Sequence, residues 1–194
     1  TIETLQKKID LHPRNTPENK KTKLINTGYL KLDHVYQKVS KSKIEENSIL
    51  LAPTLSSTLS EYNLNQYLDD LIKKILDYKQ FRLIYRPHPG DIKNSEQYKK
   101  IMNIVEKFKN NENFDLDVNT SYLESYKKSK FLITDFSGTA FTYAFSKLRP
   151  VLFISINENK LLNSNLNSLF YFKDREEVGK IIKNIDNLKE EIHS

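Results

Sequence analysis

Short apolar runs alternate along this chain with longer segments in which apolar residues recur every three or four positions. The short runs predict buried strands, and the spaced pattern predicts amphipathic helices. The predicted strands are Lys23–Leu30, which runs into a glycine turn, Ser48–Leu55, Phe81–Gly90, which two prolines stop, Phe114–Val118, Phe131–Phe136 and Val151–Ile156. Strands that alternate with helices and are apolar on both faces are typical of a parallel sheet covered on both sides. We therefore predict an α/β fold with a Rossmann-like parallel sheet of about six strands.

Helical spacing fills the intervals between these strands. The predicted helices cover residues 32–42, 62–79, 95–111, 121–129 and 138–148, and a final helix runs from about Arg175 to Ile192. Residues 1–22 contain two prolines and many charged residues, which favours a linker or N-terminal extension. Residues 23–194 are predicted to form one Rossmann-like domain. Because the chain begins with Thr1, we expect it to be a fragment of a longer protein.

Composition narrows the class of protein. The 194 residues include no cysteine and four scattered histidines, so neither disulfides nor a zinc-like metal site is predicted. No apolar run approaches the roughly 20 residues that cross a bilayer, and we expect a cytoplasmic protein. The net charge of +6 comes from lysines spread over the predicted helices, which favours peripheral contact with anionic lipid at the inner face of the plasma membrane over nucleic acid binding.

The stretch "TDFSGTA" ends a buried strand and begins a helix. Ser137, Gly138 and Thr139 would present backbone N–H groups, two hydroxyls and the positive end of the helix dipole, which together suit a phosphate. Asp135 precedes them at the strand end and joins the predicted phosphate site. The alternative is structural: Ser137 is an N-cap, and Asp135 braces the loop.

The stretch "YRPHPGD" follows an earlier strand, and its two prolines fix the backbone on both sides of His88. A histidine held in this way can donate a hydrogen bond to a phosphate or transfer a proton, and Arg86 can pair with a phosphate. The alternative is a histidine that satisfies backbone groups in a proline turn, with Asp91 starting the next helix.

A third polar turn, "NTGY", follows the first predicted strand, so Thr27 and Gly28 are further candidates for the crevice at the strand ends. Turn chemistry alone explains Gly28 equally well. Neither a Walker motif nor G-x-G-x-x-G occurs, and G-x-S-x-G is also absent. These absences argue against P-loop proteins, classical dinucleotide-binding proteins and α/β-hydrolases.

Four segments in order, "NTGYLKLD", "ILLAPT", "YRPHP" and "SKFLITDFSGTAFTYAFSKLRPVLFI", resemble the CDP-glycerol glycerophosphotransferase (teichoic acid polymerase-like) family. More broadly they resemble the donor-binding, C-terminal half of GT-B glycosyltransferases. The resemblance implies that His88 lies near the donor phosphates as a catalytic residue, and that Ser137 and Thr139 bind the donor phosphate. In two places the chain departs from the family pattern, because Gly138 replaces a second Ser and "FTYAF" replaces an acidic "FDF".

The resemblance implies a transferase that moves glycerol phosphate or a sugar from a CMP- or CDP-linked donor to a cell-envelope polymer such as teichoic acid or capsule. Its partners would be the nucleotide donor and the polymer acceptor, with no required cofactor and no metal. As the donor-binding half alone, the chain is expected to bind nucleotide without transferring. Two alternatives stay open: a sugar-nucleotide epimerase of GT-B architecture and a nucleotide-binding module without catalysis.

Overall fold

The computed structural model describes residues 28–42 and 47–193, and its centre is one six-stranded sheet. The strands are β1 (Ser48–Leu51), β2 (Arg82–Tyr85), β3 (Phe114–Leu116), β4 (Phe131–Thr134), β5 (Val151–Ile154) and β6 (Gly179–Ile182). Their order is β3-β2-β1-β4-β5-β6, and every neighbouring pair is parallel. The predicted α/β fold with a Rossmann-like parallel sheet is confirmed.

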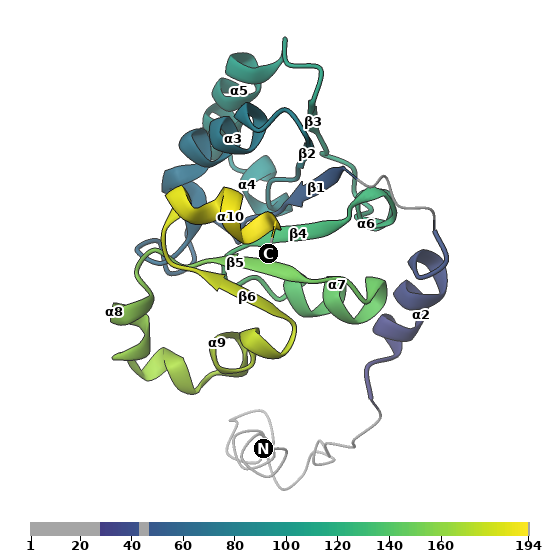
Figure 1. Ribbon diagram of the computed structural model, residues 1–194, viewed down its shortest axis with the longest axis vertical. Helices are drawn as coiled ribbons and strands as arrows, with labels where there is room; N and C mark the ends of the chain where they lie inside the picture. Colours follow the sequence, from purple (N-terminus) through teal and green to yellow (C-terminus); the bar gives the residue numbers. More distant parts are fainter. Residues whose placement is uncertain (1–27, 43–46, 194) are drawn as a thin grey trace, which may run out of the picture.

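Helices cover both faces of this sheet (Figure 1). The α-helices are α2 (Leu30–Val39), α3 (Leu68–Asp77), α4 (Pro89–Lys93), α5 (Ser95–Phe108), α6 (Leu123–Lys128), α7 (Thr139–Lys147), α8 (Glu158–Leu162), α9 (Phe170–Lys173) and α10 (Leu188–His193). Short 3-10 helices are η1 (Leu64–Tyr67), η2 (Asn165–Ser168), η3 (Arg175–Glu177) and η4 (Ile185–Asn187).

The core consists of two apolar clusters, one on each side of the sheet. On one side α3 and α5 pack against the strands, with Leu71, Ile72 and Ile75 of α3 fully buried. On the other side α2, α6 and α7 contribute residues such as Val35 and Tyr143. Fully burying one such aliphatic side chain stabilises the fold by about 1.5–3 kcal/mol. Because both faces are covered, the strands read as continuous apolar runs in the sequence.

The prediction of one final helix from Arg175 to Ile192 is wrong, because this segment contains strand β6 between two 3-10 helices. Gly179 begins β6 opposite Val151, and a Cβ at Gly179 would lie 1.9 Å from the carbonyl oxygen of Val151. Only glycine allows β6 to approach β5 this closely at that position. The observed six strands are thus five predicted ones and β6. The predicted linker over residues 1–22 and most of the predicted strand Lys23–Leu30 lie outside the described residues. The described end of that strand is not a strand, because Leu30 begins helix α2.

The strand order reverses at the centre of the sheet, where β1 is paired with both β2 and β4. In open α/β sheets, ligands bind outside the carboxyl ends of the strands at this switch point. The turns that follow β1, β2 and β4 all reach that edge. Two of them carry the stretches around His88 and Ser137 that the sequence singled out.

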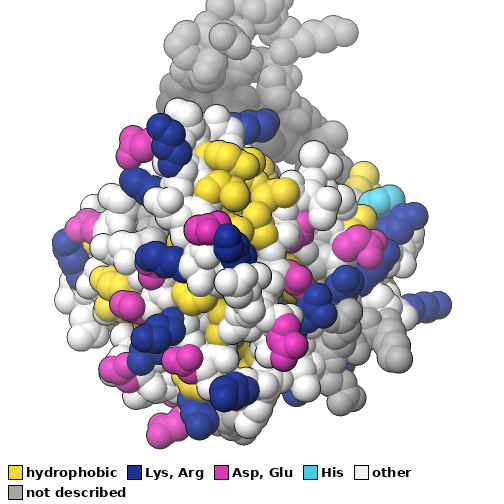
Figure 2. Space-filling model, turned by 90° about the horizontal axis from the view of Figure 1, so that it is seen from above, with side chains coloured by type: hydrophobic (Ala, Val, Ile, Leu, Met, Phe, Trp, Pro, Cys, Tyr) yellow, Lys and Arg dark blue, Asp and Glu magenta, His cyan; other side chains and the backbone are white. Residues whose placement is uncertain are grey.

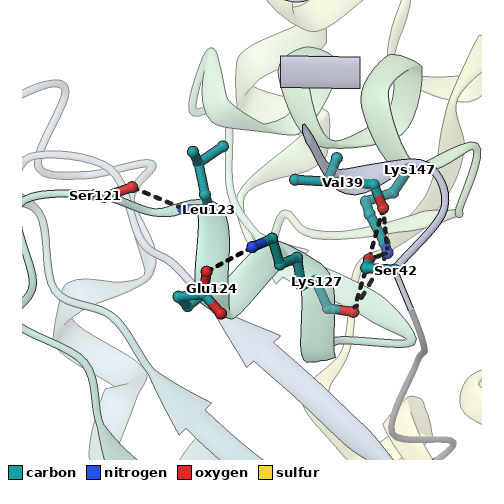
Figure 3. Close-up of polar contacts among 7 residues, drawn as sticks. All are labelled: Val39, Ser42, Ser121, Leu123, Glu124, Lys127 and Lys147. Atoms are coloured by element: carbon teal, nitrogen blue, oxygen red, sulfur yellow. Dashed lines mark hydrogen bonds and ion pairs between the residues drawn. The ribbon is translucent and has the colours of Figure 1, made fainter. Parts of the chain in front are cut away.

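Lys147, at the end of α7, joins α7 to α2 and α6 by hydrogen bonds (Figure 3). Its side chain is buried, and its Nζ atom donates hydrogen bonds to the carbonyl oxygen of Val39 at 3.1 Å, to Ser42 Oγ at 2.8 Å and to the carbonyl oxygen of Lys127 at 3.3 Å. Burial lowers the pKa of Lys147, and the charge of Arg149 lowers it further. The contact joins the C-terminal ends of α2 and α6, where a positive charge is favourable.

The surface carries both signs of charge. On the face shown in Figure 2, Lys and Arg side chains are interspersed with Asp and Glu side chains and do not form one block. Within the described ranges, no helix is long and apolar enough to span a bilayer. Peripheral contact with an anionic membrane therefore stays a prediction.

Candidate functional site

A cavity of about 350 Å³ lies at the switch point and gathers five of the predicted site residues. These residues are Arg86, His88, Ser137, Gly138 and Thr139. They come from the turns after β2 and β4, and the turn after β1 and the loop between β3 and α6 complete the walls. The fold thus brings together two stretches that are about 50 residues apart in the sequence.

His88 is the N-cap of α4, and Pro89 occupies the first helical position. Its Nδ1 atom accepts a hydrogen bond from the backbone N–H of Gly90 at 3.0 Å. Nδ1 therefore carries no proton, and in the neutral imidazole the proton is on Nε2. Among the described residues Nε2 has no hydrogen-bond partner, so an Nε2–H donor is available to a ligand in the cavity.

Gly90 holds this arrangement in place. A Cβ at Gly90 would lie 2.7 Å from Leu55 Cδ1 and 3.1 Å from His88 Nδ1. Both distances are shorter than ordinary van der Waals contacts, so a side chain here would displace the imidazole or Leu55. Sequence reasoning missed Gly90, although a glycine directly after His-Pro was a visible signal.

Ser137, Gly138 and Thr139 form the start of α7. Ser137 Oγ accepts a hydrogen bond from the Thr139 N–H at 3.3 Å, and the Tyr126 hydroxyl donates to the Thr139 carbonyl oxygen at 3.2 Å. In the part of the chain that the structure describes, the backbone N–H groups of Ser137 and Gly138 have no hydrogen-bond partner. Free N–H groups and the positive end of the helix dipole together favour an anion at this position. Gly138 has an ordinary helical φ of −59°, so its backbone conformation does not require glycine.

Arg86 lines the cavity, but its guanidinium is already bound. Nη1 pairs with Asp117 Oδ2 at 2.5 Å, and Nη2 donates to the Asn119 carbonyl oxygen at 2.8 Å. Burial raises the pKa of Asp117, and hydrogen bonds from Ser125, the Asn119 N–H and Arg86 lower it by more, so that it lies below its ordinary value. The pair fastens the loop between β3 and α6 that forms one wall of the cavity. Asp117 was not predicted as a site residue.

Asp135 lies behind the cavity and is 2% exposed. Its carboxylate accepts hydrogen bonds from the backbone N–H groups of Thr54 at 3.1 Å, Leu64 at 3.1 Å and Phe136 at 2.8 Å. Burial raises the pKa of Asp135 to about 6, although these hydrogen bonds act to lower it. The geometry matches the bracing alternative for Asp135, and the carboxylate does not line the cavity.

Asp91 braces the same loop from the other side. It is buried, and it accepts hydrogen bonds from the Ser56 N–H at 3.0 Å and from Ser56 Oγ at 2.6 Å. The loop after β1 is thus held at Thr54 and Leu64 by Asp135 and at Ser56 by Asp91. The carboxylates of Asp135, near Ser137, and of Asp91, near His88, therefore hold the loop after β1 from two sides.

The sequence model of the CDP-glycerol:poly(glycerophosphate) glycerophosphotransferases matches residues 15–194. The chain belongs to this family.

Solved structures of two kinds share the fold of this glycerophosphotransferase-family chain. The wall teichoic acid polymerase TagF, in an H444N variant with CDPG, superposes with a TM-score of 0.51 at 23% identity, over 84% of this chain and 37% of TagF. The UDP-GlcNAc 2-epimerase from Methanocaldococcus jannaschii gives a TM-score of 0.53 at 15% identity, over 86% of this chain and 42% of the epimerase. At these identities the likeness to both solved structures shows the fold alone, and the family assignment rests on the sequence model. None of the curated proteins matches the chain.

The remaining predicted site residues of this glycerophosphotransferase-family chain are Thr27 and Gly28. Thr27 is outside the described residues, and Gly28 does not line the cavity. Gly28 has φ +72°, a left-handed conformation that favours glycine, and it places Tyr29 at the start of α2. Among the described residues, no group of three or more His, Asp or Glu side chains could hold a metal ion, and a metal-free and cofactor-free site stays a prediction.

Proposed function

We propose that the described residues form the donor-binding part of a transferase that moves glycerol phosphate from a cytidine-nucleotide donor to a cell-envelope polymer. The observation that carries the proposal is that His88 and the N-terminus of α7 line one cavity at the switch point of the sheet, in a chain of the glycerophosphotransferase family. The chain spans 37% of the length of TagF, and the acceptor side of the reaction is not assigned to it.

The proposed reaction is a displacement at the β-phosphorus of CDP-glycerol. A hydroxyl oxygen of the acceptor forms the new P–O bond, the bond from this phosphorus to the bridging oxygen breaks, and CMP leaves with the bond's electron pair. The acceptor proton passes to a base outside the residues described here. The site's task is to stabilise the charge that develops on the departing phosphate.

The five predicted site residues that line the cavity have distinct parts in this proposal. The free N–H groups of Ser137 and Gly138 and the hydroxyls of Ser137 and Thr139 hold the CMP phosphate. His88 donates its Nε2–H to the bridging or terminal oxygen, because the Gly90 contact leaves Nδ1 unprotonated. Arg86 acts through Asp117 as a positioning residue for the loop between β3 and α6.

A thermal-shift screen of the chain with CDP-glycerol, CDP, CMP, UDP, GDP and ADP tests the donor class. Because a ligand that binds only the native state raises its apparent stability, the cytidine nucleotides should raise Tm the most. A larger shift with a purine nucleotide would contradict the cytidine assignment. A larger shift with UDP would favour the epimerase alternative.

We also propose that the net charge of +6 allows peripheral contact with anionic lipid at the inner face of the plasma membrane. Vesicles that contain anionic lipid should then retain the chain at low salt and release it as salt rises. Equal retention by neutral vesicles, or none by either kind, would contradict this proposal.

A further inference from the structure

A buried ion pair outside the cavity joins helix α8 to the 3-10 helix η3. Arg175 is 2% exposed and Glu158 is 3% exposed, and neither lines the cavity at the switch point. Nη2 of Arg175 donates to the two carboxylate oxygens of Glu158 at 2.8 Å and 3.0 Å, and Ser155 Oγ donates to the same carboxylate at 2.5 Å. Buried charges are stable only when they are paired and hydrogen-bonded, so these three side chains hold one another in fixed positions.

The Arg175 side chain also holds helix α9. Its Nε atom donates to the carbonyl oxygen of Phe172 at 3.0 Å, and its Cζ atom lies 5.5 Å from the centroid of the Phe172 ring. A planar guanidinium that is engaged at two nitrogens and lies against a ring has little freedom to rotate. Arg175 thus fixes the buried Phe172 ring relative to Glu158.

The Phe172 ring packs in turn against the segment that follows β4. Its centroid lies 5.3 Å from that of Phe136, and the two rings are inclined at 43°. Phe136 is held at its backbone N–H by Asp135 and at its ring by Phe172. The next two residues are Ser137 and Gly138, whose N–H groups are proposed to bind the donor phosphate.

We propose that Arg175 is a positioning residue for the donor phosphate: through the two stacked rings it orients the backbone N–H groups at the start of α7. The inference rests on the proposed function, since it takes the phosphate to lie at this turn. N–H groups stabilise a developing charge best when their direction is fixed before the reaction. Loosening the residues that support a site weakens it even when every group that contacts the ligand is present. Separation of the stacked rings should therefore weaken phosphate binding.

The same contacts stabilise the fold, and strand β4 offers a control that separates the two roles. Just past its carboxyl end Phe136 lies against Phe172, and at its amino end Phe131 lies against Phe81 with centroids 6.2 Å apart. Phe81 and Phe172 are both 6% exposed. Loss of either ring should destabilise the fold, but only the Phe172 ring adjoins the phosphate-binding turn. Phe81→Leu is therefore the matched control for Phe172→Leu.

Calorimetry with CDP, inorganic pyrophosphate and cytidine tests the proposal, at a temperature at which circular dichroism shows every variant to be folded. Phe172→Leu should weaken the binding of CDP and of pyrophosphate by about fivefold, because the turn loses one aromatic pair. Cytidine affinity should not change, because cytidine has no phosphate. Phe81→Leu should keep the wild-type affinity for all three ligands.

Arg175→Lys tests the first contact of the network. Lysine keeps a positive charge beside Glu158, but it cannot donate from one planar group to this carboxylate and to the Phe172 carbonyl oxygen. CDP affinity should fall, by less than in Phe172→Leu. The backbone amide NMR signals of Ser137 and Gly138 should move in both variants and stay in place in Phe81→Leu, which a purely structural role of Arg175 would not produce.

The outcomes separate this inference from the proposed function. Wild-type affinity for CDP and pyrophosphate in folded Phe172→Leu and Arg175→Lys would overturn the inference and leave the proposed function standing. Equal weakening in Phe81→Leu would also overturn it, since the effect would then follow from stability alone. Failure of the wild-type chain to bind CDP at all would overturn both.

Discussion

Two sets of polar residues, one lining the cavity at the switch point and one largely behind it, look alike in the sequence and differ in the structure. One set, with His88 and Ser137, lines the cavity, and each keeps a hydrogen-bond donor without a partner among the described residues. The other set, with Asp91, Asp135 and the Arg86–Asp117 pair, is buried, and its hydrogen bonds go to neighbouring loops. Binding residues thus differ from framework residues in keeping a hydrogen-bond donor without a partner, and not in being polar. Substitutions in the framework should therefore unfold the chain, and those at the lining should weaken ligand binding.

The largest effect is expected from the framework pair Arg86–Asp117. Arg86→Ala leaves a buried carboxylate without its cation and should lower the free energy of unfolding by about 3–5 kcal/mol. Arg82→Ala is a matched control on the same strand, since the Arg82–Asp115 pair joins β2 to β3 but is about half exposed. Its cost should be only about 0–1 kcal/mol. Urea unfolding measures the loss of unfolding free energy in both variants. Equal losses would mean that burial does not set the strength of these ion pairs.

A somewhat smaller effect is expected from the titration of Asp135. Its pKa is about 6 in the folded chain against the ordinary 3.8, so the folded state binds this proton more tightly than the unfolded state. The free energy of unfolding should therefore fall as pH rises from about 4 to about 6, by about 3 kcal/mol from this group.

Unfolding curves of the wild type and Asp135→Asn across this range isolate the contribution, because the asparagine does not titrate. The difference between the two proteins should change across pH 4–6. A difference independent of pH would show that Asp135 keeps its ordinary pKa.

Substitutions at the lining of the cavity should weaken ligand binding, in contrast to those in the framework. Gly90→Ala tests this contrast. The new Cβ would crowd both Leu55 Cδ1 and the His88 imidazole, so CDP affinity should fall by about tenfold, equivalent to about 1.4 kcal/mol. Leu55→Ala in the same chain removes the 2.7 Å overlap and should restore part of the affinity. Calorimetry compares the single and double variants, and full CDP affinity in Gly90→Ala would mean that the orientation of His88 does not matter.

The sequence was informative where a single segment carries the signal. Apolar runs such as Ser48–Leu55 predicted the central strands, and the spacing of Leu68, Leu71 and Ile75 predicted the helix over α3. Strand β6 was missed because its short apolar pair, Ile181 and Ile182, lies among charged residues with helical spacing. The close approach that requires Gly179 is a property of the packed sheet and not of the local sequence.

Contacts between residues of neighbouring strands could not be predicted from the sequence. The residues of the cavity were predicted because Ser137 and His88 lie in turns with distinctive local chemistry. That Arg86 binds Asp117 follows from the register of β2 and β3, in which Tyr85 lies opposite Leu116. Nothing in the sequence fixes that register, so Arg86 was interpreted as a phosphate ligand. For the same reason, the hydrogen bonds that Ser56 donates to Asp91 could not be predicted.

The central claim is that the donor phosphate is held by His88 and the start of α7. The most direct measurement is calorimetry of CDP and of cytidine with the wild type, His88→Ala and Ser137→Ala, with His34→Ala and Ser95→Ala as exposed controls. Folding is checked by circular dichroism, since loss of the Ser137 cap should cost only about 1 kcal/mol. CDP affinity should fall by about tenfold or more in His88→Ala and less in Ser137→Ala, while cytidine affinity stays unchanged and both controls match the wild type. Unchanged CDP affinity in folded His88→Ala and Ser137→Ala would contradict the account.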